Sequence, residues 1–180
     1  MSFTERYANS VNCSNLMDDQ FHSRAESLMA SAFAAMQVDG LGPLLNRVKY
    51  GDGTRSESFS AQRNMAQLST IWAEEVKRKG ADRRWLPVPR TSWDMSAYQA
   101  FHTKVAQLSL AHWLDDRCEV CEGTGIQKDQ HACPCCQGSK TKPVIGERLL
   151  VQCIMDMVSD LEGIFGSHNY RASAKMRQAA

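Results

Sequence analysis

The sequence predicts a mainly α-helical protein, a helical bundle with one small cysteine-rich module inserted between its last two long helices. Two observations favour this fold class. Apolar residues recur at steps of three and four along several long stretches, whereas the strict alternation typical of β-strands is scarce. Five of the seven cysteines fall between residues 118 and 136, so they form one local cluster and no chain-wide disulfide framework.

The apolar spacing predicts five helices in chain order. They span residues 16–37, 43–50, 57–79, 95–115 and a last stretch that begins after Pro143 and runs to 165. In each of the last three helices, one face is expected to be buried. In the helix at 57–79 this face comprises Met65, Leu68, Trp72 and Val76, and in the helix at 95–115 it comprises Tyr98, Phe101, Val105, Leu108 and His112. In the last helix it comprises Leu150, Cys153, Met157, Leu161 and Ile164.

Two breaks in the helical pattern are expected along the chain. The segment Leu86-Pro87-Val88-Pro89 cannot continue a helix, so a linker is expected over residues 80–93. This divides the chain into an N-terminal helical region, 1–93, and a C-terminal helical region, 94–180, that contains the module at 118–138. A turn is expected at 166–169, with a weak helix–turn–helix pattern over 147–178 around it.

Composition narrows the classes of function. No apolar stretch approaches the roughly 20 residues that cross a bilayer, and the N-terminus lacks a secretory signal pattern, so a cytoplasmic protein with no membrane partner is expected. The net charge of +1 argues against a globally basic nucleic-acid-binding protein, but it leaves room for a local basic patch.

The cysteine segment predicts a metal site. Two CxxC pairs, Cys118 with Cys121 and Cys133 with Cys136, are separated by eleven residues and supply four thiolates that can converge tetrahedrally on one Zn²⁺. Glycines at 123, 125 and 138 suit the tight backbone turn that follows each pair. Four sulfur ligands leave no position for water, so the zinc is expected to be structural.

Alternatives to this interpretation are buried free thiols, a redox CxxC and an iron–sulfur cluster, each of which the spacing favours less. His131 and Cys135 lie close enough in the chain to compete with Cys133 as ligands, although CxxC spacing selects Cys133 and Cys136. No motif supplies a nucleophile with a base, so the protein is not expected to be an enzyme.

Basic residues gather in two places and are candidate nucleic-acid contacts. The first set surrounds the predicted linker, near Trp85 and Trp93, and the second lies in and beside the cysteine segment; together they comprise Lys77, Arg78, Lys79, Arg83, Arg84, Arg90, Lys128, Lys140 and Lys142. A solvated helix end is the alternative interpretation of the first set, because cations also favour the C-terminal end of a helix.

The pattern CxxCxGxG followed by CxxCxG resembles the zinc repeat of the DnaJ chaperones, although Lys140 stands where a second glycine is expected. One such site between helices resembles the late-gene antiterminators, the Q proteins, of lambdoid phages. That resemblance covers roughly residues 95–165 and includes the helix at 104–113, Cys118–Gly125 and Cys133–Gly138.

The resemblance implies a phage transcription antitermination factor acting in the cytoplasm of a bacterial host. Such a protein binds promoter-proximal double-stranded DNA and RNA polymerase, and it converts polymerase to a form that reads through terminators. The four cysteines would serve as a scaffold holding one zinc. The alternative is a zinc-stabilised protein–protein interaction module, an adaptor or inhibitor without DNA binding. The sequence leaves the oligomeric state open.

Overall fold

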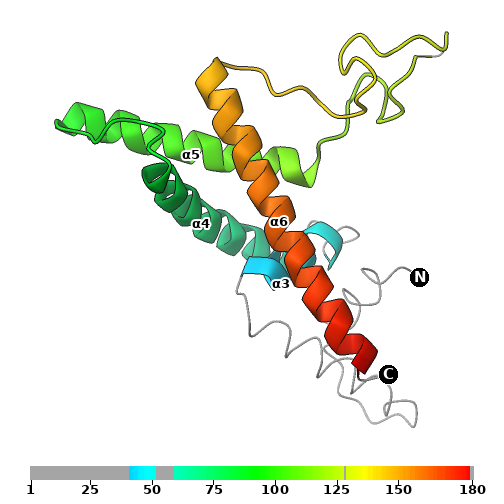
Figure 1. Ribbon diagram of the computed structural model, residues 1–180, viewed down its shortest axis with the longest axis horizontal. Helices are drawn as coiled ribbons and strands as arrows, with labels where there is room; N and C mark the ends of the chain where they lie inside the picture. The colour runs from blue at the N-terminus through cyan, green and yellow to red at the C-terminus, as the bar shows by residue number, and fades with distance from the viewer. Residues whose placement is uncertain (1–40, 52–58, 128, 179–180) are drawn as a thin grey trace. The chain divides into compact units, whose positions relative to one another are not determined.

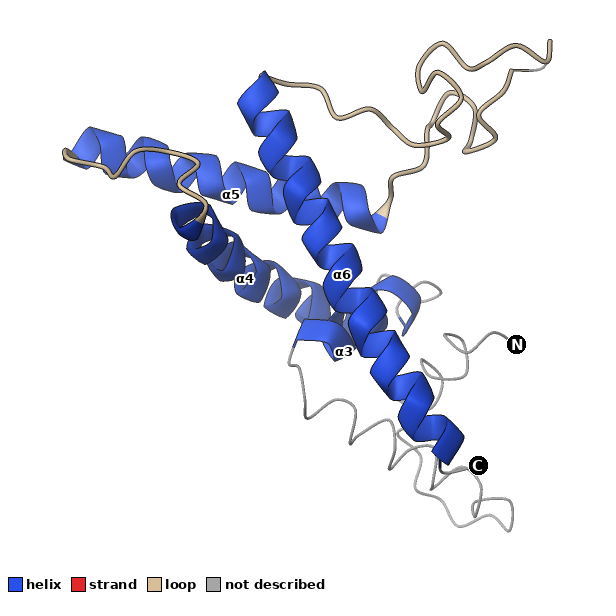
Figure 2. Ribbon diagram, viewed as in Figure 1, coloured by secondary structure: helices blue, strands red, loops and turns tan. Residues whose placement is uncertain are grey.

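The computed structural model describes residues 41–51, 59–127 and 129–178, and over these residues the protein is mainly α-helical (Figures 1 and 2). The elements are α3 (Leu41–Asn46), the π-helical turn η1 (Arg47–Gly51), α4 (Phe59–Asp82), α5 (Ser92–Leu114) and α6 (Arg148–Gln178). The described residues contain isolated β-bridges and no named strand. The predicted fold class is confirmed, while the helix expected over 16–37 lies outside the described residues.

The chain forms two compact units. One contains the residues up to Ile71 together with those from Glu162 onward, and the other is Trp72–Leu161. The sequence places a division at residue 93 along the chain, and that division stays a prediction. Among the described helices, none combines the length and the apolar character needed to span a membrane.

The core of the unit Trp72–Leu161 combines one face from each of α4, α5 and α6. Its fully or nearly fully buried side chains are Trp72, Val76, Val105, Ala106, Leu110, Trp113, Leu150, Cys153, Ile154, Met157 and Leu161. At its centre, the indole N–H of Trp72 donates a hydrogen bond of 3.0 Å to the hydroxyl oxygen of Ser109. The Ser109 hydroxyl in turn donates to the Ala106 carbonyl at 3.2 Å, so this polar pair is buried with its hydrogen bonds made.

The buried face of α5 differs from the predicted one. Leu108 is 38% exposed, whereas the polar residues His102 and Ser109 are buried. His102 lies against Trp85, with ring centroids 5.8 Å apart, and against Tyr98, at 4.2 Å. Its Nδ1–H donates to the Tyr98 carbonyl at 2.7 Å. Apolar spacing missed this face because two of its positions are polar residues. Ser109 makes its hydrogen bonds inside the protein, and His102 makes one through Nδ1, while its buried Nε2 has no hydrogen-bond partner among the described residues.

The connection between α4 and α5 is fixed at both ends. After α4, Arg84 adopts a positive φ of 53°, and the Trp85 amide donates to the Gly80 carbonyl at 3.1 Å. At the other end, the Thr91 hydroxyl accepts from the Asp94 amide, and the Asp94 carboxylate accepts from the Thr91 amide, each at 3.1 Å. This capping box starts α5, and its hydrogen bond with the Thr91 side chain lowers the pKa of Asp94.

Helix α6 continues without a break to Gln178, so the predicted turn at 166–169 and the helix–turn–helix pattern around it are wrong. In the other unit, residues within and beyond the expected turn are buried. His168 is fully buried and packs so closely on Gly42 that a Cβ atom there would lie 2.6 Å from the His168 Cβ. Ala172 is also fully buried. Tertiary packing therefore outweighs the cost of about 1 kcal/mol that each helical glycine imposes.

This correction leads to a stability prediction. Gly166 is exposed within α6, its φ is negative, and a Cβ atom built on it meets nothing within 4 Å. Gly166→Ala should therefore raise the free energy of unfolding by about 0.5–1 kcal/mol. Urea unfolding of the full chain measures it, with Gly163→Ala as the matched helical control. If Gly166→Ala destabilised the protein while Gly163→Ala did not, the result would support a turn at 166–169 instead of a continuous helix.

Candidate metal centre

Four cysteine sulfur atoms converge in the segment between α5 and α6. The Sγ atoms of Cys118, Cys121, Cys133 and Cys136 all lie within 4.8 Å of one another, and all four residues are buried. Two of the distances are 4.0 Å, between Cys118 and Cys133, and 3.7 Å, between Cys121 and Cys136. A tetrahedral ion with Zn–S bonds near 2.3 Å requires sulfur–sulfur distances of about 3.8 Å. The residues present fit such an ion.

The two CxxC pairs sit in two similar backbone turns. In the first, the carbonyls of Cys118 and Cys121 accept from Gly123 at 3.1 Å and from Thr124 at 2.9 Å. In the second, the carbonyls of Cys133 and Cys136 accept from Gln137 at 2.7 Å and from Ser139 at 2.9 Å. Each turn thus holds its two sulfurs on one side, which explains why the pattern CxxCxG recurs.

The repeat extends to positive φ angles at equivalent positions. Glu122 and Gly123 match Gln137 and Gly138, while Gly125, at 80°, matches Lys140, at 71°. Lys140 therefore holds the left-handed conformation where the first turn has glycine, at a cost of roughly 1 kcal/mol. Its carbonyl accepts from the Cys118 amide at 3.0 Å, which ties the end of the second turn to the start of the first.

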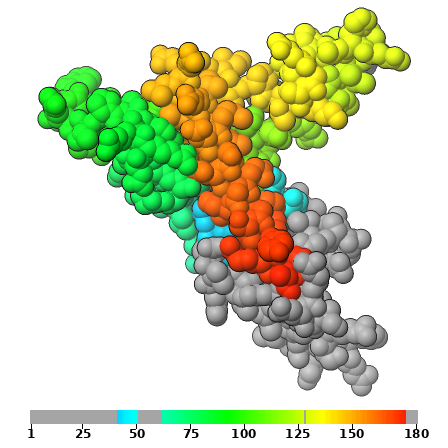
Figure 3. Space-filling model, in the orientation of Figure 1, coloured from blue at the N-terminus to red at the C-terminus, as the bar shows by residue number. Residues whose placement is uncertain are grey.

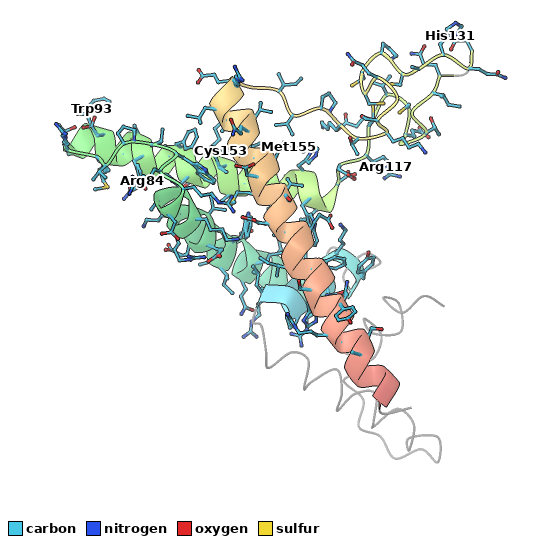
Figure 4. The ribbon with its side chains drawn as sticks, in the orientation of Figure 1. Arg84, Trp93, Arg117, His131, Cys153 and Met155 are labelled. Atoms are coloured by element: carbon cyan, nitrogen blue, oxygen red, sulfur yellow. The ribbon has the colours of Figure 1, made fainter. Side chains whose placement is uncertain are left out.

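The module is closed at its base and near its tip. An antiparallel bridge pairs Arg117 with Thr141, and another pairs Ile126 with Ala132. Lys142 adds an ion pair with Glu119. In Figure 4 the segment carries no regular helix or strand, with Arg117 near its base and His131 near its tip. Because it has little apolar core, its folding depends on whatever holds the four sulfurs together.

The electrostatics of the thiols favour a cation at their centre. Burial opposes ionisation of Cys121, but the Gly125 amide, 3.2 Å from its sulfur, and the Cys136 thiol outweigh it, and the pKa of Cys121 falls to about 6. For Cys133 the Cys136 amide also lowers the pKa, but burial and the neighbouring thiols outweigh it and raise the pKa to about 11. Four thiolates are therefore held together only with a compensating positive charge, and metal binding displaces protons.

The competing ligands stay outside the cluster. Cys135 is exposed, and the His131 side chain is 81% exposed with its Nδ1 atom 3.3 Å from the Asp129 carboxylate. The four cysteines that CxxC spacing selects are the four that converge. Outside the module, Cys153 is buried in the core of its unit, where burial raises its pKa to about 11.

Two of the turn glycines, Gly125 and Gly138, are expected to differ in how strongly a substitution weakens metal binding. A Cβ atom on Gly125 would lie 2.9 Å from the backbone oxygen of Gly138, whereas one on Gly138 meets nothing within 4 Å. Gly125→Ala combines backbone strain with a backbone clash and should weaken metal binding by about tenfold or more, while Gly138→Ala carries the strain alone and should do so several-fold less. Competition with a chelator measures both variants. Equal losses would contradict this packing.

The predicted nucleic-acid contacts divide into ion-paired and unpaired residues. Arg78 pairs with Glu75 and Asp82, Lys79 and Arg83 pair with Asp160, and Lys142 pairs with Glu119. Among the residues that the structure describes, no ion pair is found for Lys77, Arg84, Arg90 or Lys140, all of which are exposed. Lys128 lies outside the described residues. The paired cations would have to exchange a carboxylate for a phosphate, which makes the unpaired ones the better candidates.

No family model matches the chain, and no curated protein or solved structure matches it either. The site is therefore interpreted from its own geometry and chemistry.

Proposed function

We propose that this protein is a phage transcription antitermination factor, active in the cytoplasm of a bacterial host. It binds promoter-proximal double-stranded DNA and RNA polymerase and allows polymerase to read through terminators. One observation supports this proposal most. Two matched cysteine turns converge on a single four-sulfur site in the segment that joins α5 to α6, which is the arrangement on which the resemblance to the Q proteins rests.

The metal proposed for this site is one Zn²⁺, because four thiolates with tetrahedral spacing are the donor set that structural zinc prefers. When bound, zinc would cross-link the four cysteines and would leave no coordination position open for water or a substrate. Residues 118–138 would then act as a rigid projection that holds its surface in place. The proposed role of the module is therefore non-catalytic.

Charge favours a DNA contact on α4 and the linker over one on the module. Residues 118–138 contain three acidic side chains and one lysine, so the module as a whole is not basic. By contrast, residues 83–93 contain three arginines and no acidic residue. Lys77, Arg84 and Arg90 are the proposed phosphate contacts, with Lys140 as a further contact at the module.

One observation favours the second candidate, a zinc-stabilised interaction module without DNA binding. Val120 is 59% exposed and Ile126 54% exposed, and both line a hollow of about 520 Å³ on the module. Exposed aliphatic side chains around a concave surface are typical of protein-binding sites. In the antitermination proposal the same surface would face polymerase.

In vitro transcription tests the proposed function. Purified bacterial RNA polymerase is run on a phage late-promoter template that ends in an intrinsic terminator. We expect readthrough with the wild type and with Cys135→Ser, and none with Cys118→Ser. Absence of readthrough with folded, metal-loaded protein would favour the interaction module.

A binding titration separates the two candidates independently of polymerase. Affinity for duplex DNA through several phosphates should fall steeply as salt rises, and Lys77→Glu with Arg84→Glu should reduce that slope. Glu substitution at the exposed Lys104, away from these residues in the sequence, is the matched control.

A further inference from the structure

A groove runs between the proline-containing linker and the start of α5. Its volume is about 720 Å³, and its lining includes Pro87, Pro89, Arg90, Asp94, Tyr98 and Phe101. The two aromatic residues are half-buried, so part of each ring faces the groove or solvent. These residues lie at the surface of their unit, in the green region of Figure 3.

A ring stack connects the two walls of the groove, the linker and α5. Trp85, at the start of the linker, stacks on His102 of α5 with an interplanar angle of 21°, and Tyr98 packs on the same imidazole. Gly80 permits this approach, since a Cβ atom there would lie 2.4 Å from His102 Nε2. Together with the capping box at Thr91, these contacts fix the linker before any ligand binds, which lowers the entropy cost of binding.

The linker and the groove carry a net positive charge, with the guanidinium groups of Arg84 and Arg90 against the one carboxylate that lines the groove, Asp94. Arg84 and Arg90 are exposed and have no ion pair among the described residues. The carboxylate of Asp94 accepts the amides of Arg90 and Thr91 in the cap of α5. Arg83 is different, because it pairs with Asp160 at 2.7 Å. The two free guanidinium groups thus favour a polyanion.

Trp93 stands beside the groove in the first turn of α5 and is 85% exposed (Figure 4). The other three tryptophans behave otherwise, since Trp72 and Trp113 are buried and Trp85 is half-buried in the ring stack. An exposed indole that follows a linker with two arginines, for which no ion pair is found among the described residues, offers a flat surface for a nucleobase.

We propose that this groove, with Trp93 beside it, binds single-stranded nucleic acid. Trp93 stacks on an unpaired base, the half-exposed Tyr98 and Phe101 contact a neighbouring base, and Arg84 and Arg90 contact phosphates. A duplex hides the faces of its bases, so the exposed rings distinguish a single strand from double-stranded DNA. The inference rests on the proposed nucleic-acid role of the basic segment and adds a second, single-strand activity to it.

Fluorescence anisotropy with the full chain tests this inference. The probes are labelled oligothymidylate and oligouridylate of about 12 nucleotides, within the range that stacking grooves cover, and a duplex of the same length. We expect Trp93→Ala to weaken binding of the preferred single strand by about tenfold or more, and Trp93→Phe to recover part of it. The control is Tyr170→Ala, which removes an aromatic side chain that is 72% exposed on α6.

Arg90→Ala should reduce the salt dependence of single-strand binding, whereas Lys104→Ala on α5 should leave it unchanged. The comparison of DNA with RNA identifies the natural strand. Absence of single-strand binding at low salt, or an equal loss in Tyr170→Ala, would overturn the inference. So would a Trp93→Ala variant that binds the strands normally but no longer binds polymerase, because the patch would then be a protein-binding site. Readthrough that persists without single-strand binding would remove this inference and leave the proposed function intact.

Discussion

Cys118→Ser is expected to abolish tight metal binding and to unfold residues 118–140. Cys118 is fully buried, and its sulfur lies 4.0 Å from that of Cys133 within the four-sulfur cluster. Serine replaces a soft thiolate by a weakly acidic hydroxyl, so the ion loses one of its four bonds. Changes outside the ligand shell already cost about 10–100-fold in metal affinity, and loss of a ligand should exceed that range. The turns around the site have few other contacts to keep them folded.

Hydrogen exchange of the module amides measures this effect, together with metal content. In the wild type, the amides of Gly123, Gly125 and Cys133 donate to Cys118, Cys121 or Gly125 and should be protected. In Cys118→Ser they should exchange at nearly unfolded rates, while the Trp72–Leu161 core stays protected. The matched control is Cys135→Ser, which changes the exposed neighbouring cysteine and should retain both metal and protection. Retention of the metal by Cys118→Ser would contradict the ligand assignment.

Trp72→Ala is expected to lower the free energy of unfolding by about 3–5 kcal/mol, the range for a fully buried large aromatic residue. Two losses combine. The removed indole leaves a cavity among helices α4, α5 and α6, and the Ser109 hydroxyl loses the donor that lies 3.0 Å away. Trp72→Phe should cost less, because the ring still fills much of the space. Trp93→Ala, at an exposed position, should change stability by at most about 0.5 kcal/mol.

Chemical denaturation of the metal-loaded protein measures these values, and a double-mutant cycle isolates the hydrogen bond. Ser109→Ala alone leaves the buried indole N–H without an acceptor and should cost about 1–3 kcal/mol. In the Trp72→Phe background the same change should cost clearly less. Additive losses would show that the Trp72–Ser109 contact contributes nothing specific to the core.

Much of the fold follows from apolar spacing alone. The buried residues Leu68, Trp72 and Val76 of α4 and Leu150, Cys153, Met157 and Leu161 of α6 are those that steps of three and four select. The spacing failed where polar residues are buried. His102 and Ser109 in α5 lie off the predicted apolar face, and their burial involves Trp85 and Trp72 of other segments.

The end of α6 was mispredicted for a related reason. Gly166-Ser167-His168-Asn169 has the composition of a turn, and composition carries no information about the partner on which His168 packs. The metal site was predictable because its geometry is local. Two CxxC pairs with glycines in fixed places predict both turns, whereas the position of Cys135 and His131 outside the cluster and the conformation of Lys140 come from the structure.

Native mass spectrometry of the full chain, expressed in zinc-containing medium, tests the central claim that these four cysteines hold one metal ion. The same measurement is made on a variant with Cys13→Ser, Cys135→Ser and Cys153→Ala, which leaves only Cys118, Cys121, Cys133 and Cys136. We predict one zinc ion per chain in both proteins. A metal-free spectrum, an iron–sulfur cluster, or loss of zinc from the folded variant would contradict the account.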